Sequence, residues 1–205
     1  FKRSPVMFLR DVLRLTLAAA FFLGSPLAEA GLVPPDASFF NFLTPKVTPA
    51  QLRTLAHFPA FSQGPRSGPT VNILFIPGCP HCRALWRQLQ VLRKTEKQAA
   101  QYHYRWIPVL VSPASAGLLL PYWNTARNGQ ALAQLMTHDQ MNGPLNHSEP
   151  VLKLQTELKP SLVWLQGTGA QMAPALIRTD AKPVQLHLGD PSPAILQYWL
   201  GIYVH

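Results

Sequence analysis

A short apolar run anchors the hydrophobic pattern of the chain. Residues 71–76 read Val-Asn-Ile-Leu-Phe-Ile, and such a run between turn residues predicts a buried strand. From about residue 80 to near residue 97 the apolar residues return at helical spacing, which predicts a helix. Residues 102–111 are rich in aromatic and β-branched residues and predict a second strand, with Pro108 at a strand end, an edge or a bulge. Together these segments predict a β-α-β unit.

The second half of the chain turns helical and then returns to strands. Between 113 and about 158, stretches rich in Ala and Leu alternate with breaks, which predicts a helical insertion. Ser161–Leu165 is short and apolar and predicts a buried strand, and the alternation over 184–188 predicts another. A last helix is predicted over 194–200. We therefore place one domain at 71–205, in the order β-α-β, helical insertion, β-β-α.

The N-terminal part of the chain predicts export. Basic residues precede a short apolar core at 15–23, and Ala28-Glu29-Ala30 has the small-x-small pattern of a cleavage site. Residues 1–30 thus predict a cleavable signal peptide, with an uncleaved membrane anchor as the alternative. Residues 31–70 predict a short extension and linker. In it, Thr48-Pro49-Ala50-Gln51 has the residues of a helix start, and 62–69 predict an exposed loop.

Composition and charge narrow the class of protein. The 205 residues suffice for one ordinary domain with extensions, and 47% hydrophobic with 13% charged residues is a globular composition. The formal net charge is +9, but Lys and Arg are scattered and form no run of the kind that binds nucleic acid. We therefore expect no nucleic-acid partner.

The only cysteines of the chain, Cys79 and Cys82, flank Pro80 and His81. An exported protein normally pairs its cysteines. A disulfide between Cys79 and Cys82 would close a very small loop and stabilise the fold little, so the pair is predicted to be a reactive dithiol. A zinc site would need further ligands, and the histidines show no pair at zinc-finger spacing. We expect neither a metal nor a cofactor.

The position of the dithiol predicts a role for each residue. A thiolate is the nucleophile in thiol chemistry, and the N-terminus of a helix stabilises negative charge. We predict that Cys79 is the nucleophile with a lowered pKa, that His81 tunes it, and that Cys82 resolves the mixed disulfide. Two arginines, Arg83 and Arg87, would add positive potential.

At these residues the chain resembles the DsbC/DsbG-like group of exported thiol–disulfide oxidoreductases. Phe75–Cys82 is similar to the redox site of that group, and the Pro80-His81 pair is of the DsbA type. The resemblance implies an α/β, thioredoxin-like fold with the helical insertion described above. Glu157–Val163 resembles the segment that carries the family's cis-proline. This implies that Pro160 is the cis-proline and that Pro160 and Lys159 bind substrate. Lys159 takes the position before the proline, where the family commonly has Thr or Val.

Two features depart from that group. Residues 31–70 are too few for its N-terminal dimerisation domain, so the oligomeric state stays open. The buried acidic residue found behind many thioredoxin-like redox sites has no counterpart in 71–76, so a proton acceptor must come from elsewhere.

The resemblance implies a periplasmic oxidoreductase that acts on cysteines of exported or envelope proteins. A membrane redox partner would recycle its dithiol. The direction of electron flow, as oxidase, isomerase or reductase, is left open. The alternative is a non-catalytic thioredoxin-fold component of an envelope secretion or conjugation system, suggested by the N-terminal region and by Lys159.

Overall fold

The computed structural model describes residues 47–138, 147–170 and 172–202. The predicted signal peptide and residues 31–46 of the predicted extension lie outside these residues. A mixed sheet of five strands, in the order β1-β3-β2-β4-β5, forms the centre of the described part. Strands β2 and β3 are parallel and the other neighbours are antiparallel. The strands are β1 (Phe61–Gln63), β2 (Thr70–Phe75), β3 (His103–Pro108), β4 (Ala175–Arg178) and β5 (Gln185–Leu188).

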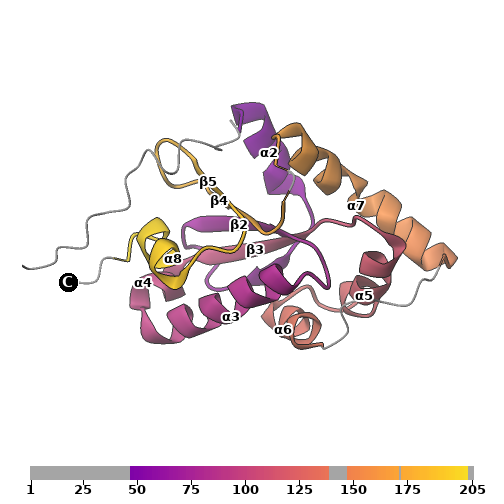
Figure 1. The fold of residues 1–205 in the computed structure, drawn as a ribbon, viewed down its shortest axis with the longest axis horizontal. Helices are drawn as coiled ribbons and strands as arrows, with labels where there is room; N and C mark the ends of the chain where they lie inside the picture. The colour runs from indigo at the N-terminus through magenta and orange to yellow at the C-terminus, as the bar shows by residue number, and fades with distance from the viewer. Residues whose placement is uncertain (1–46, 139–146, 171, 203–205) are drawn as a thin grey trace, which may run out of the picture. The chain divides into compact units, whose positions relative to one another are not determined.

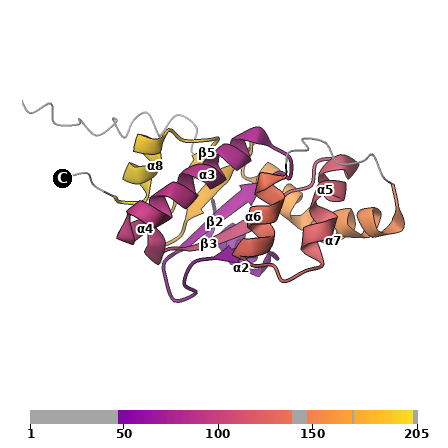
Figure 2. The ribbon, with the colours of Figure 1, turned by 90° about the horizontal axis from the view of Figure 1, so that it is seen from below.

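Helices cover both faces of the sheet. Figure 1 shows α3, α4 and α8 on one face and α2 with α7 on the other, and Figure 2 shows α3 and α6 in front of the strands. The described helices are α2 (Pro49–His57), α3 (Pro80–Thr95), α4 (Lys97–Gln101), α5 (Pro113–Trp123), α6 (Gly129–Thr137), α7 (Glu149–Gly167) and α8 (Pro193–Trp199). None of them combines the length and the hydropathy needed to cross a membrane.

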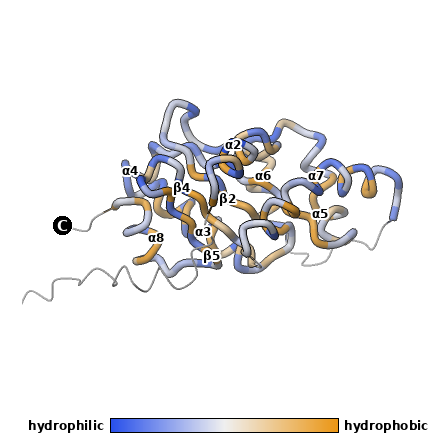
Figure 3. The backbone as a smooth tube through the Cα atoms, turned by 90° about the horizontal axis from the view of Figure 1, so that it is seen from above, coloured by the Kyte–Doolittle hydropathy of each residue, from blue (hydrophilic) through white to orange (hydrophobic). Residues whose placement is uncertain are grey.

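The alternation of side chains along β2 divides the interior into two cores. Val71, Ile73 and Phe75 point into the core under α3, α5, α6 and α8, whereas Leu74 points into the core under α2 and α7. Figure 3 shows hydrophobic residues concentrated along the central strands. The predicted β-α-β unit is confirmed, with α3 and the short α4 between the parallel strands β2 and β3, and Pro108 ends its strand.

The segment before residue 70 belongs to this sheet, which corrects the prediction of a linker there. The predicted start of α2 is confirmed, with Thr48 and Gln51 forming a capping box and Pro49 in the first turn. However, β1 lies within residues 31–70 and pairs with β3, although an exposed loop was predicted from residue 62. Three residues are enough for this edge strand, because Phe61 is fully buried.

Half-buried Arg105 fixes α2 against the sheet. Its guanidinium donates to the carbonyl of Leu55 at 3.2 Å and to that of Phe58 at 2.6 Å, at the end of α2. It also donates to Oδ1 of buried Asn72 at 2.8 Å. A charge with three acceptors satisfies polar groups that would otherwise be buried without partners. Helix α2 is therefore part of the domain that holds the cysteines.

The predicted strand at Ser161–Leu165 is wrong. These residues form the last turns of α7, which runs from Glu149 to Gly167 and extends the helical insertion past residue 158. The pattern is that of an amphipathic helix, whose buried residues are Val151, Leu154, Leu158, Ser161, Trp164 and Leu165. Ser161 also anchors α7 by donating to the carbonyl of Pro108 at 2.7 Å. The strand that pairs with β5 is Ala175–Arg178 instead.

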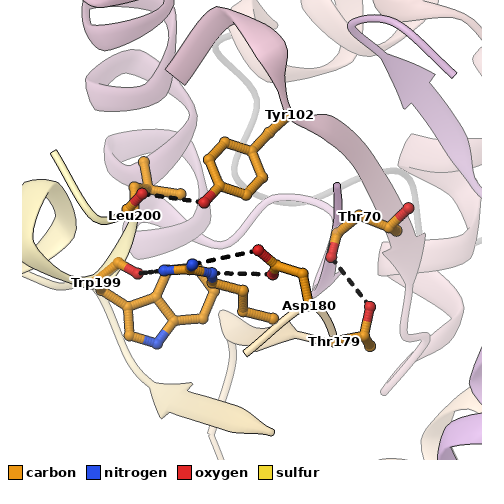
Figure 4. A network of polar contacts seen from close by, with 7 residues as sticks. Thr70, Tyr102, Thr179, Asp180, Trp199 and Leu200 are labelled. Carbon is orange, nitrogen blue, oxygen red and sulfur yellow. Dashed lines mark hydrogen bonds and ion pairs between the residues drawn. The ribbon is translucent and has the colours of Figure 1, made fainter. Parts of the chain in front are cut away.

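The C-terminal helix is tied to the end of the sheet opposite the cysteines. Arg178, which pairs with Val71 at the start of β2, donates to Asp180 and to the carbonyl of Trp199. The hydroxyl of Tyr102 donates to the carbonyl of Leu200 at 3.0 Å. Figure 4 shows these contacts next to the hydrogen bond from Thr179 to Thr70. This network holds the end of α8 in place without contacting the dithiol.

Candidate active site

The two cysteines lie where β2 leads into α3. After Phe75 the chain turns through Ile76, Pro77 and Gly78, and Gly78 has φ +85°, a conformation that favours glycine. The N–H of Cys79 donates to the carbonyl of Ile76 at 3.0 Å and closes the turn. Cys79 is the N-cap of α3 and Pro80 its first residue, where the missing N–H costs nothing. The amides of His81 and Cys82, in this first turn, interact with the Cys79 sulfur.

The two thiols have opposite environments. Cys79 is partly exposed, whereas Cys82 is completely buried in the core under α3. A hydrogen bond from the Cys82 thiol, opposed by burial and assisted by the amides of Cys82 and His81, lowers the pKa of Cys79 from 9.0 to about 6. These amide contacts are looser than a capping hydrogen bond. The same thiol–thiol contact, together with burial, raises the pKa of Cys82 far above its ordinary value. At neutral pH the pair therefore holds one thiolate, on Cys79.

The positive side chains contribute less than the sequence suggested. His81 is exposed in the first turn of α3, and its charge is the smallest of the causes that lower the pKa of Cys79. Arg83 donates to the carbonyl of His138, the C-cap of α6, at 3.1 Å. The predicted lowering of the Cys79 pKa is thus present, but the Cys82 thiol is its largest cause.

The predicted cis-proline is at a different position. Pro160 and Lys159 are exposed residues inside α7, so neither opens a strand. Among the described residues, the cis peptide bonds are Ala173–Pro174 and Lys182–Pro183. The carbonyl of Ala173 lies 3.9 Å from the Cys79 sulfur, and Pro174 immediately precedes β4. The prediction failed because the apolar run after Pro160 has the length of a strand, whereas its buried residues follow helical spacing.

An apolar cavity of about 350 Å³ adjoins the Cys79 turn. Ile76 and Ala173, which flank Cys79, are part of its wall, and Val111 and Met172 are more than half exposed at its edge. Leu162 of α7 completes this apolar surface. Exposed apolar side chains around a reactive sulfur suit contact with an unfolded or partly folded polypeptide.

Sequence reasoning gave no role to the segments that approach the dithiol from the C-terminal half. Gly189 donates to the carbonyl of Pro174 at 2.7 Å, so the β5–α8 loop lies against the segment that contacts Cys79. Asp190 follows and accepts a hydrogen bond from Gln88 of α3 at 3.3 Å. An Ala-Pro dipeptide before the apolar residues 175–177 was the available signal for the strand entry. No sequence signal placed Asp190 beside α3.

Comparison with known proteins gives structural but not sequence relatives. No family model matches the sequence, and no curated protein matches it. A periplasmic thioredoxin-like protein from Salmonella enterica serovar Typhimurium is similar in structure, with TM-score 0.53, 16% identity, and coverage of 76% of this chain and 97% of that chain.

Two further solved structures give the same result. The thiol-disulfide exchange protein alpha-DsbA2 from Wolbachia pipientis has TM-score 0.53 and 13% identity, with 74% of this chain and 93% of that chain covered. The catalytic domain of Proteus mirabilis ScsC has TM-score 0.51 and 14% identity, with 74% and 94% covered. Identities this low establish the arrangement of the chain and no more. The α/β fold of this protein is thioredoxin-like, as the sequence predicted.

Proposed function

We propose that this protein is a periplasmic thiol–disulfide oxidoreductase that acts on cysteines of exported or envelope proteins. The observation that supports this most is the asymmetry of the dithiol. A partly exposed Cys79 with a pKa of about 6 lies beside a buried Cys82 that stays protonated. The names of the structural relatives, which include a periplasmic protein and a thiol-disulfide exchange protein, support the same reaction class.

In the reductive direction, the Cys79 thiolate attacks one sulfur of a substrate disulfide. A bond forms between Cys79 and that sulfur, and the other substrate sulfur leaves as a thiolate. Cys82 then attacks Cys79, which releases the second substrate sulfur and leaves a Cys79–Cys82 disulfide. The protein loses two electrons and the substrate gains them. The oxidative direction is the reverse of the same steps.

The substrate chain is proposed to lie along Ala173 and Pro174, which replace Lys159 and Pro160 in this role. The contact between Ala173 and the Cys79 sulfur supports this assignment, and the apolar cavity beside it offers a place for a hydrophobic substrate side chain. The DsbC/DsbG-like assignment is also a proposal, and the similarity of Phe75–Cys82 to the redox site of that group supports it. Export through residues 1–30 and a membrane partner that recycles the dithiol are further proposals.

Reduction of insulin by dithiothreitol, with and without the protein, tests the proposal. We expect the wild-type protein to accelerate the reaction and Cys79→Ser to abolish the acceleration. Equal rates for the two proteins would contradict the proposal and favour a non-catalytic scaffold, for which Lys159 no longer argues because it lies in α7. The reduction potential then gives the direction: about −120 mV indicates an oxidase and about −270 mV a reductase.

A further inference from the structure

The resolving step requires a proton acceptor, and the strand that leads into the site does not supply one. Cys82 is completely buried, and this burial still opposes its ionisation when Cys79 is bound in the mixed disulfide, so Cys82 holds its proton until it attacks. Strand β2, which leads into the site, contains no ionisable side chain. Its one amide, Asn72, is bonded to Arg105 on the opposite face of the sheet from Cys82.

The β5–α8 loop brings the carboxylate of Asp190 against α3. Gly189 is bonded to Pro174, and Asp190 accepts from Gln88, so two hydrogen bonds fix the loop between the Cys79-contacting segment and α3. His81 and Gln88 are seven residues apart and share one face of the helix. Asp190 is thereby held on the side of α3 that carries His81.

Electrostatic interactions agree with this placement. The carboxylate of Asp190 opposes ionisation of Cys82, and His81 attracts it. Partial burial raises the pKa of Asp190, which makes it a better proton acceptor than an exposed carboxylate, and His81 works against this rise. The titratable groups of α3 that interact with Asp190 are therefore His81 and Cys82.

We propose that Asp190 accepts the proton of Cys82 when Cys82 resolves the mixed disulfide. As the Cys82 sulfur bonds to Cys79, its proton passes to the carboxylate, directly or through one water molecule, and the substrate sulfur leaves as a thiolate. In the oxidative direction the protonated carboxyl returns the proton to Cys82 as that sulfur leaves Cys79. This inference rests on the proposed redox function and assigns a residue to its second step.

The reaction of the reduced protein with one equivalent of DTNB separates the two steps. The first coloured thiolate is released when Cys79 attacks, at a rate that depends on DTNB concentration. The second is released when Cys82 resolves the adduct, at a rate that does not. Mass spectrometry distinguishes the adduct from the Cys79–Cys82 disulfide. Absence of a second phase in the wild type would refute the proposed function itself.

We expect Asp190→Asn to leave the first phase within about twofold and to slow the second on the order of a hundredfold, a usual size for loss of an acid–base group. Asp190→Glu should restore most of the rate. Gln88→Ala, which frees the carboxylate from its partner, should slow the second phase less than Asp190→Asn does. Glu149→Gln removes the same charge from an exposed site on α7 and should change neither phase.

The pH dependence of the second-phase rate distinguishes proton transfer by Asp190 from a merely structural role. With the carboxylate present, the second-phase rate should be nearly flat around neutral pH. In Asp190→Asn it should rise with hydroxide concentration, about tenfold per pH unit, because hydroxide must then deprotonate Cys82. His81→Ala is measured alongside to exclude titration of the imidazole. A wild-type second phase and pH profile in Asp190→Asn would overturn the inference and leave the proposed function standing.

Discussion

Replacing Cys82 by alanine should change the pKa of Cys79 more than any other single substitution near the site. The Cys82 thiol is the largest cause of the lowered pKa, because its S–H donates to the Cys79 thiolate. Alanine removes the donor, whereas serine keeps one. We therefore expect the pKa to rise from about 6 toward 9.0 in Cys82→Ala, and much less in Cys82→Ser or His81→Ala.

The size of the effect follows from the two pKa values. At about pH 7, a thiol with a pKa of about 6 is about 90% ionised, and one with a pKa of 9.0 about 1%. Thiolate reactivity falls as the pKa falls, by about 20-fold over this interval. The net advantage of the wild type in attacking a disulfide is then only about fourfold at about pH 7, but about 40-fold at about pH 5.

The assay must therefore follow pH and not a single rate. We would measure iodoacetamide alkylation of Cys79 by mass spectrometry across pH, together with the ultraviolet absorbance of the thiolate. Cys82→Ala should shift the midpoint of both curves upward. An unchanged midpoint in Cys82→Ala would refute the reasoning and leave the helix terminus as the main cause. A larger shift in His81→Ala than in Cys82→Ala would refute it as well.

Three further predictions concern the fold. Arg105→Leu should lower the free energy of unfolding by about 3 kcal/mol in urea denaturation, since buried acceptors lose their donor. Exposed Arg53→Gln should change it little. Folding lowers the pKa of Cys79, so the free energy of unfolding of the reduced protein, compared with that of Cys79→Ser, should increase as the pH rises from about 6 toward 9. The increase should be about 1 kcal/mol at about pH 7 and should disappear below about pH 6. A gain that grows with falling pH would contradict this sign. Gly64→Ala should cost at least about 2 kcal/mol more than Gly169→Ala. Both have positive φ, but a Cβ at Gly64 would lie 2.2 Å from the carbonyl oxygen of Tyr102 and one at Gly169 meets nothing within 4 Å. Equal losses would show that the backbone at Gly64 moves aside.

Features that depend on contacts between residues close in the sequence were predictable from the sequence. The capping box at Thr48, the β-α-β unit and the position of Cys79 at the start of α3 depend on local backbone preferences and on the spacing of apolar residues. Local geometry also suffices for a low pKa at Cys79, because its main causes lie within the next three residues. The order of strands and helices predicted from the sequence was accurate enough to identify the thioredoxin-like fold.

The choice of proline was decided by tertiary structure. Pro160 and Pro174 both precede apolar residues, and only the packing of the chain shows that one is inside a helix and the other opens a strand. The buried residues of 149–167 follow helical spacing, although Pro160 inside the helix cannot donate a backbone hydrogen bond. The helix persists because its buried residues pack into both cores and Ser161 bonds to Pro108.

The sequence by itself determined the reactive element: a cysteine at a helix N-terminus with a second cysteine one turn later. These features need only neighbouring residues, whose contacts are set by the geometry of a single turn. The surroundings of that element needed the folded chain. Ala173 approaches Cys79 across 94 positions, and Asp190 reaches Gln88 across 102. Such contacts arise when sheet order brings distant segments together, and a one-dimensional pattern of apolar residues does not specify which segments will meet.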